Sequence, residues 1–199
     1  MRISDDRYSR DRLRFDVAVQ FIRHEARTRT IREWTGLSDD RIRKLYRSYL
    51  ADSSAVAPVR HRGKSPRTAS FFTRNQRTRA EASLLASLCC SVGAMPERAT
   101  PEQANSLASL GRAELLCQAY GIYRAAIADA LISFEHAVFL LTALVRRDEL
   151  RLDSCRGCAA YLIVDRWSLR SPHCAICGDD AIASDACEAE VRQGSAAER

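Results

Sequence analysis

The chain has 199 residues, of which 46% are hydrophobic and 28% are charged, with a formal net charge of +6. These values are typical of a soluble globular protein with one domain or two small ones. The longest apolar run, residues 137–145, contains Thr142 and is far shorter than the ~20 residues that a membrane span needs. With neither a span nor a recognisable signal peptide, we expect no membrane association and a cytoplasmic location.

Positive charge is concentrated in the N-terminal part of the chain. Residues 1–80 contain 20 Lys and Arg against 9 Asp and Glu, whereas residues 81–199 contain 11 against 16. This clustering favours a nucleic-acid partner over an evenly solvated surface. Nearly all the positive charge is arginine, which suits bidentate contacts to phosphate and guanine, although genome composition can produce the same bias.

Residues 1–50 are predicted to form a basic helical region. Residues 1–11 are polar and are expected to be frayed. From Arg12, apolar residues recur at helical spacing and predict a stripe that faces the core. These residues are Phe15, Ala18, Val19, Ile22 and Ala26.

Two short helices with a glycine between them are predicted next. The first covers 30–35 and stops at Gly36; Ser38 can cap the second, which runs through 41–47 and ends before Ala51. Helix, glycine turn and helix is the pattern of a helix-turn-helix. Arg32, four positions before the glycine, departs from the small residue that is usual there. An ordinary helical hairpin with a solvated basic face fits this segment equally well.

The second of these helices carries basic residues outside its apolar stripe of Ile42 and Leu45. A major groove or a row of phosphates could meet them there, so we predict DNA contacts from this face. The predicted contacts are Arg41, Arg43, Lys44 and Arg47.

Residues 51–70 are predicted to be a basic linker, because they contain Pro58, Pro66 and several serines without helical periodicity. A flexible basic arm can lie along a phosphate backbone, although a plain solvated linker has the same composition. The predicted contacts in this arm are Arg60, Arg62, Lys64 and Arg67.

Residues 71–152 are predicted to be a helical core, with helices over about 71–92, 102–128 and 132–150. The broad apolar surface of the third predicts deep burial or a partner helix. Cys89, Cys90 and Cys117 are interpreted as buried small hydrophobes. No Ser, His and Asp set, carboxylate pair or phosphate-binding glycine loop is present, so we do not expect an enzyme.

Residues 153–178 contain the strongest chemical signal, C-R-G-C at 155–158 and C-A-I-C at 174–177, with fifteen residues between them. Each two-residue gap lets one tight turn direct two thiolates at one ion, so the pattern predicts one structural Zn²⁺ held by Cys155, Cys158, Cys174 and Cys177. His173 could replace one ligand. The β-prone run 161–164 could form one arm of a hairpin. Residues 179–199 are expected to be a mobile polar tail.

Other chemistry for these cysteines fits less well. Disulfides need an oxidising compartment, which nothing at the N-terminus implies. A redox pair of the thioredoxin type needs a βαβ pattern, which is absent. Four thiolate ligands would also leave no open position for a catalytic zinc to bind water or substrate.

Several features, in chain order, resemble the FlhC family, the C subunit of the bacterial flagellar master transcriptional activator. They are R-I-R-K-L-Y-R at 41–47, G-x-x-P at 63–66, the aromatic pair 71–72, A-Y-x-x-Y at 119–123, the apolar helix before Leu152, and S-C-x-x-C with the second C-x-x-C at 154–177. The resemblance covers about 30–178. It implies an α-helical protein with a zinc region, in which the same four cysteines ligate zinc, and no catalytic residues.

The resemblance also implies a hetero-oligomer with FlhD that binds promoters of flagellar genes and helps to recruit RNA polymerase. We therefore predict a mainly α, cytoplasmic, DNA-binding subunit of a transcriptional activator. The alternative is a zinc-stabilised adaptor that binds only protein, through the helix at 132–150. A zinc or thiol enzyme is the third hypothesis, and the closed set of four ligands disfavours it.

Overall fold

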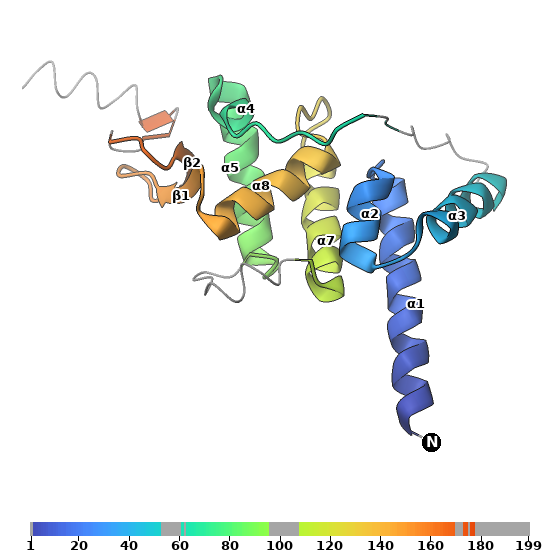
Figure 1. Cartoon of the computed structure of the whole chain (residues 1–199). Helices are drawn as coiled ribbons and strands as arrows, with labels where there is room; N and C mark the ends of the chain where they lie inside the picture. Colours follow the sequence, from blue (N-terminus) through green and yellow to red (C-terminus); the bar gives the residue numbers. More distant parts are fainter. Residues whose placement is uncertain are drawn as a thin grey trace, which may run out of the picture.

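The computed structural model describes residues 2–52, 61, 63–95, 108–169, 173–174 and 176–177. This part of the chain is mainly helical, as predicted, and includes a two-stranded antiparallel sheet (Figure 1). Its helices are α1 (Arg2–Arg23), α2 (Thr28–Thr35), α3 (Asp39–Asp52), α4 (Ser70–Thr73), α5 (Gln76–Ser91), α7 (Leu110–Ala126) and α8 (Phe134–Arg146). Its strands are β1 (Leu150–Ser154) and β2 (Tyr161–Asp165). The division into domains at the predicted boundaries stays a prediction, although β1 crosses the one at 152/153.

Helix α1 begins ten residues before the predicted start at Arg12, so the expectation of a frayed segment there is wrong. Its buried face is also rotated from the predicted one, because Val17 and Phe21 are fully buried whereas Phe15 and Val19 are half-buried. The aromatic ring of Phe21 sets this rotation. It lies 6.0 Å from the ring of Trp34 in α2 and 4.9 Å from that of Phe134 in α8.

Helices α2 and α3 lie where the sequence predicts two helices. Gly36 ends α2 in the left-handed conformation, with φ of 70°, and its N–H donates to the carbonyl of Arg32 at 2.9 Å. Helix α3 buries Ile42 and Tyr46, and the Tyr46 hydroxyl donates to the carbonyl of Ala26 at 2.9 Å. The Arg32 guanidinium reaches Asp39 at the start of α3, at 3.5 Å.

The predicted helix over 71–92 is divided into α4 and α5. Asn75 adopts an extended backbone and its side chain accepts from the N–H of Thr78 at 2.8 Å, which starts a new helix at Gln76. Cys89 in α5 and Cys117 in α7 are buried, as predicted, and burial raises the pKa of each thiol to about 12. Cys90 is only half-buried.

Helices α7 and α8 are shorter than predicted within the described residues. Helix α7 starts at Leu110 after the capping residue Ser109, and the predicted segment 102–107 lies outside the described part. Helix α8 stops at Arg146 because Arg147 is left-handed, with φ of 55°. Eight residues of α8 are buried, so the broad apolar surface of this helix packs into the protein's own core: Phe134, Glu135, Ala137, Leu140, Leu141, Ala143, Leu144 and Val145.

A buried carboxylate joins α5 to α7 and to the loop after α7. Glu81 is 5% exposed and accepts hydrogen bonds from the Tyr123 hydroxyl at 2.5 Å and from the N–H of Leu131 at 2.8 Å. It also pairs with Arg77 at 3.0 Å. Burial raises the pKa of the Glu81 carboxyl, but these donors outweigh it and lower the pKa below the ordinary value.

A second buried carboxylate caps α2 from a distant helix. Residue Arg27, at the start of α2, makes no side-chain cap of its own. Glu135 in the first turn of α8 accepts from the N–H of Arg27 at 2.8 Å and from the hydroxyl of Thr30 at 2.9 Å. A negative charge at the N-terminus of a helix is favourable because unpaired N–H groups converge there. Glu135 therefore joins the N-terminal helices to the core.

The sheet is a hairpin that packs against α5. Strand β1 pairs with β2 in antiparallel register, with Leu152 opposite Ile163. The backbone of Ile163 bonds to two α5 side chains: its N–H donates to the Ser83 hydroxyl at 2.9 Å, and its carbonyl accepts from Arg79 Nε at 2.9 Å. These contacts fix the position of the hairpin, whose turn holds the first cysteine pair.

No described helix has the length and apolar character that crossing a bilayer requires.

Candidate metal centre and basic surfaces

The hairpin brings the four predicted cysteines together. Their sulfur atoms all lie within 4.8 Å of one another, and the sulfurs of Cys158 and Cys174 are 3.7 Å apart. With metal–sulfur bonds of about 2.3 Å, the sulfurs of a tetrahedral site lie about 3.8 Å apart. The four cysteines could therefore hold one metal ion. Cys155 is buried and Cys158 is exposed, so the cluster lies at the surface with one side covered.

The first cysteine pair is the turn of the hairpin. The N–H of Cys155 donates to the carbonyl of Ala160 at 2.8 Å, and the N–H of Ala159 donates back to the carbonyl of Cys155 at 2.9 Å. Ala159 closes the turn in the left-handed conformation, with φ of 60°. The predicted arm at 161–164 is thus part of β2, and its partner strand, β1, precedes Cys155.

Close packing between the two pairs requires a glycine at position 157. A Cβ atom on Gly157 would lie 2.9 Å from both Cβ and Sγ of Cys177. Real Cβ contacts are not this short, so a side chain here would push the second pair away from the first.

Backbone N–H groups donate hydrogen bonds to sulfur atoms of the cluster and shift the pKa values of its cysteines. The N–H of Cys174 donates to the sulfur of Cys155 and the N–H of Cys177 to the sulfur of Cys174, both at 3.3 Å. The first of these bonds lowers the pKa of Cys155 to about 6, and the second lowers that of Cys174. Bonding to the Cys174 sulfur raises the pKa of Cys177 to about 12. Neighbouring thiolates repel one another, and a bound cation would offset this repulsion.

His173 is half-buried beside the second pair, and its Nδ1 has no hydrogen-bond partner in the described part of the chain. It does not belong to the cluster of four sulfurs. Four sulfurs already complete a tetrahedral shell, so the arrangement suits an ion that holds two turns together rather than one that binds a substrate.

The basic residues predicted on α3 are all exposed, namely Arg41, Arg43, Lys44 and Arg47. Arg43 pairs with Asp40 at 2.9 Å, and the guanidinium of Arg41 lies over the ring of Phe15 at 6.0 Å. Lys44 and Arg47 form no ion pair with any carboxylate of the described residues. These two are three positions apart and lie on one side of the helix.

The basic linker is described only in part. Lys64 and Arg67 are exposed, whereas Arg60 and Arg62 lie outside the described residues. The Arg27 guanidinium donates to the carbonyl of Lys64, and His61 lies 3.0 Å from Glu25. These contacts place the linker beside the start of α2.

A shallow cleft of about 510 Å³ lies between the linker and α2, and most of its lining is basic or polar. Arg27 and Arg29 contribute to it, although the sequence patterns indicated neither residue. Their position beside Lys64 depends on the hydrogen bond between Arg27 and Lys64, which are 37 positions apart in the sequence, and no local pattern predicts this bond. The cleft lies at the other end of α2 from the turn that leads into α3.

Comparison with models of known protein families finds none that matches this chain. No curated protein matches it either.

Proposed function

We propose that the protein is the DNA-binding subunit of a transcriptional activator, and that α2, the Gly36 turn and α3 act as its helix-turn-helix. The exposed basic side of α3 is the observation that carries this proposal. Ile42 and Tyr46 fix one side of the helix in the core, so Lys44 and Arg47 project from the other without a carboxylate partner among the described residues. Unpaired cations on a rigid helix are the groups that phosphates and guanine edges attract.

Zinc is the proposed metal of the four-cysteine cluster. Soft thiolate ligands in a tetrahedral set select Zn²⁺ or iron–sulfur chemistry, and two C-x-x-C turns at this separation are typical of structural zinc. The ion would neutralise the thiolates and hold the second pair against the hairpin turn. In this role Zn²⁺ stabilises the segment after β2 and takes no part in a reaction.

The resemblance to the FlhC family supplies the rest of the proposal. An FlhD-type subunit would complete a hetero-oligomer that binds promoters of flagellar genes and recruits RNA polymerase in the cytoplasm. Lys64, Arg67 and the two linker arginines outside the described residues would add contacts to the phosphate backbone.

Binding to a flagellar promoter, measured by fluorescence anisotropy over a series of salt concentrations, tests the proposal. The chain is co-expressed with its FlhD-type partner and titrated onto promoter DNA and onto a scrambled duplex. The logarithm of the association constant should fall linearly with the logarithm of salt, because cationic side chains displace counterions from DNA. Replacing one phosphate contact, as in Lys44→Gln or Arg47→Gln, should make that slope shallower by ~0.9.

Arg146→Gln is the matched control, because Arg146 is an exposed arginine in the last turn of α8 and does not belong to α3 or to the linker. Its slope should equal that of the unmodified protein. An affinity that does not depend on salt, or α3 variants that bind like the control, would exclude the α3 contact.

A zinc-stabilised adaptor is the second candidate, and one observation favours it. Three large apolar side chains on the cysteine region are strongly exposed, Trp167 at 76%, Leu169 at 101% and Ile176 at 81%. Where such side chains form one contiguous patch, the patch often marks a protein-binding site. The adaptor would use these side chains, because α8 is buried in the core. It predicts partner binding without any shift of promoter DNA.

A further inference from the structure

A cleft of about 790 Å³ lies between the hairpin and the ends of two helices. Cys90 and Ser91 at the end of α5, Met95 in the turn that follows, the last turn of α8 and both strands form its walls. Its volume falls in the range of about 300–1,000 Å³ that is usual for small-molecule sites. The cleft is separate from the four cysteines, none of which lines it.

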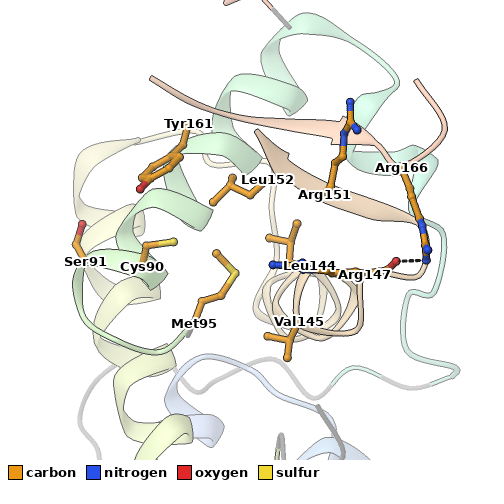
Figure 2. Close-up of a pocket in the computed structure, with 10 residues that line it drawn as sticks. All are labelled: Cys90, Ser91, Met95, Leu144, Val145, Arg147, Arg151, Leu152, Tyr161 and Arg166. Atoms are coloured by element: carbon orange, nitrogen blue, oxygen red, sulfur yellow. Dashed lines mark hydrogen bonds between the residues drawn. The ribbon is translucent and has the colours of Figure 1, made fainter. Parts of the chain in front are cut away.

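The floor of the cleft is apolar. Met95, Leu144 and Val145 are buried and Leu152 is half-buried, and Figure 2 shows Met95, Leu144 and Leu152 converging on the cavity. This floor can pack against a hydrocarbon chain or a ring, because removing apolar surface from water is favourable.

Arginine residues form one side of the cleft, and none of the described residues that line it is acidic. Arg151 has a carboxylate partner, since its Nη2 lies 3.4 Å from Oδ2 of Asp153. Arg147 and Arg166 form no ion pair with a carboxylate of the described residues.

The Arg166 side chain is oriented by the backbone of Arg147 and by a neighbouring ring. The guanidinium of Arg166 donates to the backbone carbonyl of Arg147 (Figure 2) and lies over the ring of Trp167 at 5.3 Å. A carbonyl bond orients a guanidinium without neutralising its charge. Two positive charges that line one cleft, without a carboxylate partner among the described residues, favour the approach of an anion.

We propose that this cleft binds a small amphiphilic anion, a molecule with one carboxylate and an apolar body. The carboxylate would bind Arg147 and Arg166, since guanidinium groups bind carboxylates through charge-assisted hydrogen bonds. The apolar body would lie on Met95, Leu144 and Leu152. This site is independent of the proposed DNA binding, because α3 does not line it.

Isothermal titration of the 199-residue chain, purified with its metal, with decanoate tests the site. Decanoate should bind saturably with one molecule per chain. Decyltrimethylammonium, which has the same chain and the opposite charge, should not bind measurably, and 1-decanol should bind at least about tenfold more weakly, a difference of ~1.4 kcal/mol.

Variants separate the arginine pair from the general surface. Arg166→Gln and Arg147→Asn should each weaken the binding of decanoate about tenfold. Asparagine is chosen at position 147 because it tolerates the left-handed backbone there. Arg166→Lys keeps the charge, so it should lose less affinity for decanoate than Arg166→Gln. Arg146 is a neighbouring exposed arginine that does not line the cleft, so the variant Arg146→Gln should bind decanoate like the unmodified protein.

Circular dichroism and metal content confirm that each variant is folded. The site is excluded if decanoate and decyltrimethylammonium bind equally, if folded Arg166→Gln and Arg147→Asn bind like Arg146→Gln, or if decanoate shows no saturable binding tighter than ~1 mM.

Discussion

The carboxylate of Glu135 is predicted to be one of the most important single groups for the stability of the N-terminal helices. It accepts from the N–H of Arg27 at 2.8 Å and from the hydroxyl of Thr30 at 2.9 Å, and it is 5% exposed. Hydrogen bonds to a charged group contribute about 1.5–3 kcal/mol each. Allowing for partial replacement by water, Glu135→Ala should lower the free energy of unfolding by ~3 kcal/mol.

Glu135→Gln is the discriminating control, because it keeps the shape of the side chain. Its carbonyl can accept from Arg27, and the Thr30 hydroxyl can rotate to accept from its amide. Only the interaction of the charge with the start of α2 is then lost, about 0.3–1 kcal/mol.

Urea unfolding followed by far-UV circular dichroism measures both changes. A Thr30→Val variant, combined with Glu135→Ala in a double-mutant cycle, isolates the bond between the two side chains, expected to be ~1 kcal/mol. If Glu135→Ala costs no more than Glu135→Gln, or if the cycle shows no coupling, the carboxylate does not cap α2 as described.

Three further predictions concern the metal centre and pH. Cys158→Ser should lower the amount of bound metal, measured by atomic absorption, and should unfold the segment after Leu152, which faster hydrogen exchange there would show. Unchanged metal content would refute the ligand assignment. Gly157→Ala should weaken metal binding in a chelator competition, because its Cβ would lie 2.9 Å from the Cys177 sulfur, and equal affinity would contradict this packing. The pKa of His24 is lowered, first by burial and then by Arg124, so the unfolded chain binds a proton that the folded protein resists. The free energy of unfolding should therefore fall as the pH drops below 6.5, with a smaller fall in His24→Gln.

The sequence predicted the helical class and the cysteine cluster well, because both depend on local signals. Helical periodicity and a C-x-x-C spacing need only neighbouring residues. The start of α5 as a helix separate from α4 also had a local signal in Asn75, whose capping preference the apolar pattern hid.

Interactions between distant residues could not be predicted in this way. Glu135 bonds to residues 105 and 108 positions away, and nothing in its neighbourhood distinguishes it from a solvated glutamate. The rotated face of α1 has the same origin, since Phe21 is turned inward by aromatic rings on α2 and α8. Leu150 continues the apolar pattern of α8 but belongs to β1, because periodicity does not distinguish a short strand from the end of a helix.

The bonds from Ser83 and Arg79 to Ile163 also bear on how copies of the chain behave in a crowded cell. An open strand edge is a template on which another chain can add a strand, which leads to aggregation. Here both peptide groups of Ile163 at the middle of β2 are already bonded to side chains of α5. A helix thus takes the place that a neighbouring strand would occupy, and growth of the sheet at that point requires the hairpin to leave the core first.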